Sequence, residues 1–337
     1  MCYFSKNQIY YLLMKTSTEF KMQHKKDFGR EKLEILFEDQ WVVVVNKPSG
    51  MLSCPYPGSK NRTAQSVLEE IMRKRGTLNS HHKPLVVHRL DRDTSGVMMF
   101  ALTEPAQKKI MDTWHQMVTE RLYHAVAENP SDAKMMLPDF GLIDDPLAFN
   151  AYNVGFVPKA GDKSNRKPSK HEDSIYERHL DSKGNFKTVP ARTHFCIKER
   201  GKVYTLFELS LDTGKKNQIR AHLASKGYPL AGDENFRAKS DPFMRLALHA
   251  RTLEFNHPFT GEHMKFEVPE PEEWMDFVKR TTYISKADYF NPVKEVSQKY
   301  GGKKTLENNS PMENSRRITG KQKNHMDFIK QGQNSRR

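Results

Sequence analysis

The chain has 337 residues, a formal net charge of +14 and a mean hydropathy of −0.78, and it is long enough for one large domain or two smaller ones. No apolar run approaches the ~20 residues of a membrane-spanning helix, which argues against an integral membrane protein. Three cysteines without paired spacing argue against a disulfide framework or a zinc site, and we expect a cytoplasmic protein.

The positive charge is concentrated at the two ends of the chain. Residues 1–30 carry six Lys and Arg against two acidic residues, and residues 281–337 carry twelve against five. Basic ends fit a polyanionic partner such as RNA or DNA, but they fit a solvated tail equally well. Charge alone therefore leaves both interpretations open.

The first predicted elements are two strands and a helix. Residues 33–47 (LEILFEDQWVVVVNK) predict two strands around a turn, and the second strand is β-branched and buried. Residues 62–76 have the spacing of an amphipathic helix, with Thr63 as its N-cap and Gly76 at its end. The apolar residues 96–102 then predict another strand.

The rest of the chain is predicted to contain more strands than helices. Residues 104–118 predict a helix with Pro105 in its first turn, and residues 217–227 predict a short helix closed by Gly227. The remaining predicted strands cover residues 122–128, 191–199, 203–211, 245–255 and 264–271, and a last helix covers residues 271–280. Because several strands follow one another directly, we expect an α+β fold on a mixed, largely antiparallel sheet. No glycine pattern of a nucleotide-binding loop supports a nucleotide cofactor.

Polar segments divide the chain. Residues 1–30 are predicted to be a basic N-terminal extension, residues 31–280 the folded domain, and residues 281–337 a basic, disordered C-terminal tail. Within the folded domain, the polar stretch 159–174 predicts a surface insertion.

The stretch VHRLDRDTSGVMMFAL has carboxylates at the spacing of a calcium loop. Asp91 and Asp93 would take the first and third positions of such a loop. An EF-hand loop needs a bidentate Glu at its twelfth position, where this chain has Leu102. We therefore expect a turn and a buried strand here, and no calcium site.

Asp91 needs another explanation. A charged carboxylate on a turn before a buried strand is costly to desolvate, and a cation or several N–H donors must keep it ionised. Arg89 and Arg92 lie beside it in the sequence, and Arg220 lies in the segment TGKKNQIRAH. From these residues alone, Asp91 can be a structural residue that pairs with an arginine, or it can present a carboxylate for chemistry.

The same stretch closely resembles the H-R-L-D-x-x-T-S-G motif of the RluA-type pseudouridine synthases. Four further segments resemble motifs of that family in the same order, so that the resemblance covers roughly residues 33–275. They are EDQWVVVVNKPSGML (38–52), ERLYHAVAE (120–128), LDTGKKNQIRAHLASKGYPLAGD (211–233) and LALHARTLEFNHPFTGE (246–262). The resemblance implies the pseudouridine synthase fold, with flanking helices and a central active-site cleft.

The resemblance implies roles for four residues. Asp91 matches the catalytic aspartate, which attacks the target uridine at the ribose C1′ or the uracil C6; C5 then replaces N1 as the atom bonded to the sugar. The attacking group must be an anion, and Arg220 matches the arginine that pairs with it. Tyr123 matches the motif tyrosine, which is expected to take part in proton transfer at C5, with stacking as the alternative role. Arg89 matches the arginine thought to fill the gap left by the flipped nucleotide.

Further residues are expected to bind the substrate by the same resemblance. They are Lys47, His88, Thr94, Lys215, Gln218 and His222. Where the family commonly reads T-G-R-x-H-Q-I-R, Lys215 replaces an arginine and Asn217 replaces a histidine, and we expect only local RNA contacts to change. The resemblance requires no cofactor and no metal, and it implies RNA, ribosomal or transfer, as the partner. We take a monomer as the default state.

Three functions of different classes remain. The first is an RNA pseudouridine synthase, which is favoured because Asp91, Tyr123 and Arg220 are all present. The second is a catalytically idle RNA-binding protein on the same fold. The third is a hydrolase that acts on nucleosides or sugars through the same carboxylate. The histidines of HHKPLVVH lack partners at metal spacing, and the zinc deaminase motifs are absent from the sequence.

Overall fold

The computed structural model describes residues 33–56, 61–150, 153–159 and 186–280. These residues all lie in one compact unit, Met1–Pro292. The predicted extensions 1–30 and 281–337 lie outside the described residues, and so does the predicted insertion 159–174 apart from its first residue. Within the described ranges, no helix is both long and apolar enough to cross a membrane.

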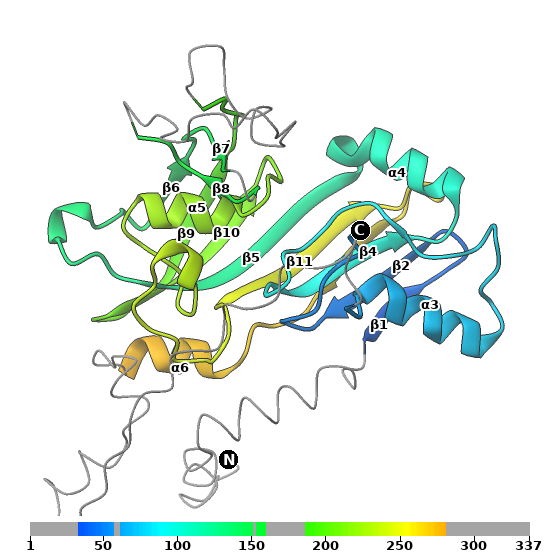
Figure 1. Cartoon of the computed structure of the whole chain (residues 1–337), viewed down its shortest axis with the longest axis horizontal. Helices are drawn as coiled ribbons and strands as arrows, with labels where there is room; N and C mark the ends of the chain where they lie inside the picture. Colours follow the sequence, from blue (N-terminus) through cyan, green and yellow to red (C-terminus); the bar gives the residue numbers. More distant parts are fainter. Residues whose placement is uncertain (1–32, 57–60, 151–152, 160–185, 281–337) are drawn as a thin grey trace, which may run out of the picture. The chain divides into compact units, whose positions relative to one another are not determined.

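A large sheet forms the centre of the fold in the described part of the chain (Figure 1). Its main path runs β1 (Glu34–Glu38), β2 (Val42–Lys47), β4 (Ser95–Ala101), β11 (Leu248–Asn256), β5 (Val118–Glu128), β10 (Tyr204–Leu211), β9 (Thr193–Arg200) and β6 (Phe140–Ile143). Two more strands join it, β3 (Leu85–Val86) beside β4 and β12 (His263–Glu267) beside β11. β7 (Ala148–Phe149) and β8 (Gly155–Phe156) form a separate pair. Among the described strands of this sheet, only β4 and β11 pair in parallel, which confirms the predicted mixed, largely antiparallel sheet.

Helices flank the sheet, and local sequence fixes their ends (Figure 1). The described helices are α3 (Ala64–Arg75), α4 (Glu104–Met117), α5 (Gln218–Ser225) and α6 (Glu273–Arg280), with short 3-10 helices η1 (Ala133–Met135) and η3 (Glu234–Phe236). At the start of α3 the Thr63 side chain accepts a hydrogen bond from Ser66 N–H, and Gly76 ends the helix in the left-handed conformation, as predicted. Thr103 caps α4 in the same way as Thr63 caps α3.

The core occupies both faces of the sheet because strand side chains alternate between them. Val43 of β2 belongs to the apolar cluster that α3 and α5 cover, whereas Val44 belongs to the cluster that α4 covers. Val126 of β5 packs with Trp274 of α6. α3 and α5 therefore cover one face of the sheet, and α4 and α6 cover the other. Each fully buried large apolar side chain contributes roughly 1.5–3 kcal/mol, so both layers are held firmly.

The differences from the predicted elements concern strand limits, the edge strand β6 and the two-residue strands β3, β7 and β8, which are too short for a sequence pattern to predict. β6 is absent from the predicted elements because this short edge strand exposes Phe140 and fully buries only Ile143, which leaves a weak sequence pattern. β5 is longer than predicted and starts at Val118, directly after α4. β11 starts at Leu248 because the residues before it form turns.

Candidate active site

Asp91 lies in the turn between β3 and β4. Thr94 N–H donates to the Asp91 carbonyl oxygen at 3.2 Å and closes this turn. β4 then runs beside β11, where Gly96 has a φ of 112°. A Cβ atom on Gly96 would lie 2.1 Å from the Ala250 carbonyl oxygen, so the close approach of the two strands requires glycine. The motif glycine thus fixes where the turn meets the centre of the sheet.

The loop after β2 holds the Asp91 turn by its backbone. Ser53 Oγ donates to the Leu90 carbonyl oxygen at 2.7 Å, and Lys47 Nζ donates to that of Arg92 at 3.0 Å. Lys47 is fully buried, and its ammonium group also donates to two carbonyl oxygens of its own loop. A buried ammonium needs such acceptors. Lys47 is expected from the sequence to bind the substrate, but it is not among the described residues that line the cavity, and its ammonium group orders the turn that carries Asp91.

The carboxylate of Asp91 is contacted from the start of α5. Arg220 Nη1 donates to Asp91 Oδ2 at 3.3 Å, and Asn217 Nδ2 donates to the same oxygen at 2.6 Å. Arg220 is itself held by Asp233, which accepts from Nε at 2.7 Å and from Nη2 at 2.8 Å. The Arg220 side chain is only 9% exposed, so this bidentate pair fixes the guanidinium whose remaining nitrogen reaches Asp91.

The two carboxylates keep Arg220 charged inside the protein. Burial acts to lower the pKa of this guanidinium, but the hydrogen bonds and charges of Asp233 and Asp91 outweigh burial and raise the pKa. Arg220 therefore stays cationic and balances part of the negative charge at Asp91.

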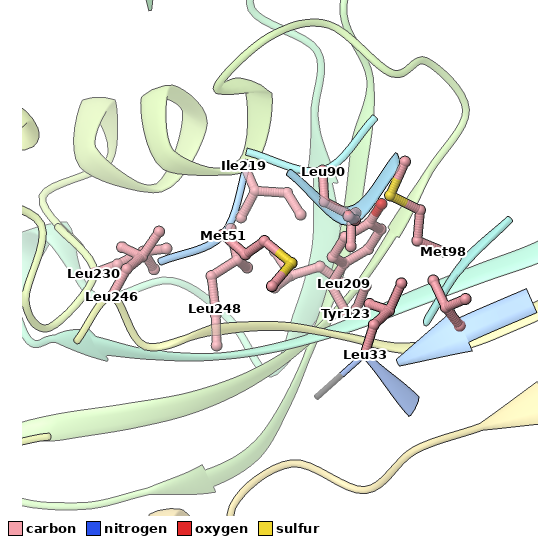
Figure 2. Close-up of a cluster of buried hydrophobic side chains, with 14 of the residues drawn as sticks. Leu33, Met51, Leu90, Met98, Tyr123, Leu209, Ile219, Leu230, Leu246 and Leu248 are labelled. Carbon is pink, nitrogen blue, oxygen red and sulfur yellow. The ribbon is translucent and has the colours of Figure 1, made fainter. Parts of the chain in front are cut away.

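Tyr123 of β5 contributes a phenol to the same site. The residue is 9% exposed and stands in the apolar cluster with Leu90 and Leu209 (Figure 2). Burial and the charge of Asp91 raise the pKa of Tyr123, although the charge of Arg121 acts in the opposite direction. The phenol is therefore protonated at neutral pH, and it offers an aromatic ring and an O–H group.

His88 forms part of the wall next to this phenol. Its ring packs against Trp114 of α4 with the ring centroids 4.9 Å apart, and its Nε2 accepts from Met99 N–H at 2.9 Å. Burial, together with the charge of Arg121, lowers the pKa of His88 to about 3. His88 is therefore neutral at pH 7 and presents a ring without a positive charge.

These side chains surround one cavity of about 1090 Å³. Of the predicted site residues, those that line it are Asp91, Tyr123, Arg220, His88, Arg89, Thr94, Lys215 and Gln218. Its described lining includes one acidic residue, Asp91, and six cationic residues: Arg89, Arg92, Arg121, Lys215, Lys216 and Arg220. Pockets for small ligands measure roughly 300–1,000 Å³, so a cavity of this size with a cationic wall fits a piece of a polyanion.

Two predicted binding residues, His222 and Gln218, already make hydrogen bonds within the protein. His222 is fully buried, and its ring nitrogens each lie 2.9 Å from an oxygen, Thr193 Oγ1 and the Asp145 carbonyl oxygen. Gln218 lines the cavity, but its amide nitrogen donates to Thr193 Oγ1 at 3.0 Å and its amide oxygen accepts from Lys215 N–H at 3.0 Å. Contrary to expectation, His222 therefore lies outside the cavity, because its ring ties α5 to β9.

The chemistry available in this cavity centres on one carboxylate. Among the described residues, no group of three or more His, Cys, Asp or Glu side chains is placed to hold a metal ion. The Asp91 side chain is 24% exposed, and both of its donors bind Oδ2. An ionised carboxylate can act as a nucleophile, and the cations around it can bind the phosphates of a nucleic acid.

The sequence does not predict the contacts that three residues make at this site. Asn217 is expected from the sequence to affect only RNA contacts, and Asp233 and Arg121 are given no role. Arg121 precedes Tyr123 by two residues on β5, so the alternation of strand side chains could have placed it in the cavity. No such signal links Asn217 to Asp91, which lies 126 positions away in the sequence.

Comparison with known proteins identifies sequence relatives along most of the described chain. Residues 41–225 match a family model described as RNA pseudouridylate synthase. YlyB of Bacillus subtilis, an uncharacterised RNA pseudouridine synthase, is 35% identical over 248 residues, which cover 73% of this chain and 72% of YlyB. The ribosomal large subunit pseudouridine synthase D of Pasteurella multocida is 31% identical over 271 residues, which cover 76% of this chain and 72% of the relative.

Solved structures share the fold at lower sequence identity. Human RNA pseudouridylate synthase domain containing 4 matches with a TM-score of 0.52 at 21% identity, over 74% of this chain and 92% of the human one. Human RNA pseudouridylate synthase domain containing 1 matches with a TM-score of 0.51 at 19% identity, over 82% of this chain and 98% of the human one. These matches show a common α+β architecture.

Proposed function

The chain belongs to the RluA-type family of RNA pseudouridine synthases, which are isomerases, and we propose that Asp91 is the nucleophile of its reaction. The observation that carries this proposal is the position of the Asp91 carboxylate. It lines a cationic cavity, with Arg220 and Asn217 donating to one of its oxygens. A carboxylate with a fixed cation at its side and an opening in front of it is equipped for attack on a substrate carbon.

The reaction exchanges one bond of the uridine for another. The target nucleotide leaves its stack so that its glycosidic bond can enter the cavity. Asp91 attacks C1′ of the ribose or C6 of the uracil, the bond between N1 and C1′ breaks, and the base turns. C5 then bonds to C1′, the carboxylate is released, C5 loses its proton and N1 gains one. Substrate and product have the same atoms, so one ionised carboxylate and a proton relay are sufficient.

The neighbouring side chains have supporting parts in this proposal. The Tyr123 ring lies against the base, and its phenol passes on the proton that leaves C5. Arg89 is exposed at the cavity, where its planar cation can fill the gap left by the flipped nucleotide. Arg92, Lys215 and Lys216 line the same wall and bind the phosphates of flanking nucleotides.

We propose ribosomal RNA of the large subunit as the substrate. The support is the 31% identity to a relative named ribosomal large subunit pseudouridine synthase D, and transfer RNA is the alternative. We also propose a monomer that works in the cytoplasm. Cys54 and Cys196 are free thiols, as in proteins of reducing compartments.

The test is the release of tritium from RNA labelled at uracil C5, since isomerisation expels this label whereas hydrolysis and simple binding do not. Unmodified large-subunit, small-subunit and transfer RNA are assayed separately. We expect wild type to release tritium from large-subunit RNA. Asp91→Asn removes the anion and keeps the shape of the side chain, so its rate should be lower by about 10³-fold or more, with RNA affinity within about threefold of wild type.

Each contrary outcome refutes a different part of the proposal. Release by Asp91→Asn at the wild-type rate would exclude Asp91 as the nucleophile. An equal loss of RNA binding in this variant would make Asp91 a structural residue. Release from transfer RNA alone would refute the proposed substrate, and no release by wild type from any RNA would favour a catalytically idle RNA-binding protein.

A further inference from the structure

Asn217 begins α5 in a way that differs from the starts of α3 and α4. Thr63 and Thr103 have extended backbones and cap their helices with their side chains. Asn217 has a φ of 59° and a ψ of 19°, in the left-handed region, and makes no side-chain cap hydrogen bond. Asparagine is enriched in this conformation, but a cap hydrogen bond that is normally made at this position is absent. The amide of Asn217 is thus free for another contact.

The Asn217 side chain bridges two distant segments instead. Its Nδ2 donates to Asp91 Oδ2 at 2.6 Å, and its Oδ1 accepts from Gly155 N–H at 3.4 Å. The orientation of the amide follows from chemistry, because an amide oxygen this close to a carboxylate oxygen would be repelled. Asn217 is also the nearer of the two donors, since Arg220 Nη1 lies at 3.3 Å and the other nitrogens of Arg220 bind Asp233.

Both donors bind the same oxygen of the carboxylate. Asp91 Oδ2 accepts from Asn217 and Arg220, whereas Oδ1 accepts no hydrogen bond from the residues that the structure describes. A lone pair engaged by a donor is less available for bond formation than one without a donor. Building on the proposed role of Asp91 as nucleophile, we propose that Asn217 is a positioning residue that holds Oδ2 together with Arg220, so that Oδ1 attacks the uridine.

In the attack by Asp91, the same electron pair forms the bond to the substrate and is later returned to the carboxylate. Oδ1 supplies the electron pair of the new bond to the attacked carbon, C1′ or C6, and takes this pair back when the adduct breaks before the product leaves. Asn217 and Arg220 donate to Oδ2 throughout, so the carboxylate does not rotate and exchange its oxygens. Fixing one oxygen matters because the reacting atoms must approach to about 3–3.5 Å with correct alignment.

The test separates the amide of Asn217 from its backbone conformation. Asn217→Gly accepts a positive φ and removes the amide. Asn217→Asp keeps the shape and replaces the donor by a second anion. Asn217→His tolerates the same backbone and supplies an N–H donor again. Single-turnover tritium release from the RNA that wild type modifies, at saturating enzyme, gives the chemical rate; filter binding gives the RNA Kd, and thermal unfolding gives the Tm.

We expect Asn217→Gly to lower the chemical rate by about 10–100-fold and Asn217→Asp to lower it further, with Kd within about threefold of wild type. The Asn217→His rate should stay within about fivefold of wild type, because its donor is restored. A wild-type rate in Asn217→Gly would overturn the proposal. So would a rate loss accompanied by an equal loss of RNA affinity, or a loss as large in Asn217→His as in Asn217→Gly.

Asp91→Asn in the same assay distinguishes this proposal from the proposed function. An active Asp91→Asn protein would refute Asp91 as the nucleophile, and with it the role of Asn217. An inactive Asp91→Asn protein together with a fast Asn217→Gly protein would refute only the positioning role.

Discussion

The two faces of the sheet use charged residues differently, and the neighbours Tyr123 and His124 of β5 show the contrast. Tyr123 lies on the face that carries the cavity and Asp91, and strand alternation turns His124 to the other face. There, a ring nitrogen of His124 lies 3.1 Å from Glu208 Oε2 and the other lies 2.9 Å from Glu270 Oε1. Each of these carboxylates also pairs with a cationic side chain, Glu208 with Lys198 of β9 and Glu270 with Arg251 of β11.

The two faces differ in whether their carboxylates have partners for both oxygens. On the far face, each of the two carboxylates contacts both the His124 ring and a cationic side chain. We call His124, Glu208, Glu270, Lys198 and Arg251 the back cluster. Burial acts to raise the pKa of Glu270, but the hydrogen bond and charge of His124 and the charge of Arg251 lower it to about 2. A strongly shifted pKa therefore does not by itself locate the active site in this protein. A carboxylate with one unoccupied oxygen in a cavity does so better.

Among the substitutions that test this difference between the two faces, Asp233→Asn should have the largest effect. It removes the negative charge that holds Arg220. Removing one partner of a buried pair typically costs about 3–5 kcal/mol, because the other charge stays buried. We expect the free energy of unfolding to fall by about 3 kcal/mol, since Asp91 still balances part of the charge. Activity should fall as well, because Arg220 loses its bidentate anchor. Urea unfolding and tritium release measure the two effects.

The matched control for this substitution is Asp276→Asn. Asp276 pairs with Arg280 on the exposed side of α6, and exposed pairs contribute only about 0–1 kcal/mol. Its stability and activity should stay close to wild type. If Asp233→Asn were as stable as this control, the stability of the cavity face would not depend on the buried pair of Arg220 and Asp233. The comparison with the back cluster would then concern activity alone.

A smaller effect, confined to activity, is expected from Tyr123→Phe. The ring and its burial are kept and the O–H group is lost, so kcat should fall by about 100-fold if the phenol relays a proton. The free energy of unfolding should change by less than about 1 kcal/mol. Because burial and the charge of Asp91 raise the pKa of Tyr123 above 10.0, this group should not titrate in a kcat profile from pH 6 to 9.5. A loss below about threefold would leave Tyr123 a stacking role only.

The adjacent substitution His124→Gln should give the opposite pattern. The back cluster loses the imidazole ring that lies between Glu208 and Glu270, so we expect the free energy of unfolding to fall by about 2 kcal/mol while kcat stays within about twofold. Urea unfolding and kcat, measured for both Tyr123→Phe and His124→Gln, test this expectation. If His124→Gln lowered kcat as much as Tyr123→Phe, the two faces would not be independent.

Features that depend on neighbouring residues are predictable from the sequence. The ends of α3 at Thr63 and Gly76 follow from residues within one helical turn, and both are where the sequence places them. The buried strand after the Asp91 turn follows from its apolar run in the same way. The contact between Asp91 and Arg220 was expected only through the family resemblance, because no local pattern links these residues.

Features that depend on distant contacts are not predictable in this way. Lys47 and His222 lie in segments that resemble family motifs, yet both side chains turn into the protein, because the packing of β2 against the turn and of α5 against β9 decides their direction. The contact between Asn217 and Asp91 additionally requires a positive φ at Asn217. Asparagine is enriched in that conformation, but most asparagines do not adopt it, and the neighbouring residues do not specify it.

An effect that disappears at low pH is expected from Glu270 of the back cluster. The pKa of Glu270 is about 2 in the folded protein and ordinarily 4.5, so its ionised form stabilises the fold above pH 4.5. This contribution is lost as the pH falls from 4.5 to about 2. The difference corresponds to at most roughly 3 kcal/mol, and we expect about 2 kcal/mol because the side chain is partly exposed.

Glu270→Gln should therefore be about 2 kcal/mol less stable than wild type at pH 7, and the two proteins should nearly converge toward pH 2. Urea unfolding at pH 7, 4 and 2.5 measures this convergence. The kcat at pH 7 should stay within about twofold of wild type, because Glu270 lies outside the cavity lining. A stability difference that is constant with pH would mean that Glu270 acts through packing and not through charge. A changed kcat would mean that the charges on one face of the sheet affect the reaction on the other. β5, which carries both Tyr123 and His124, would then connect the two faces.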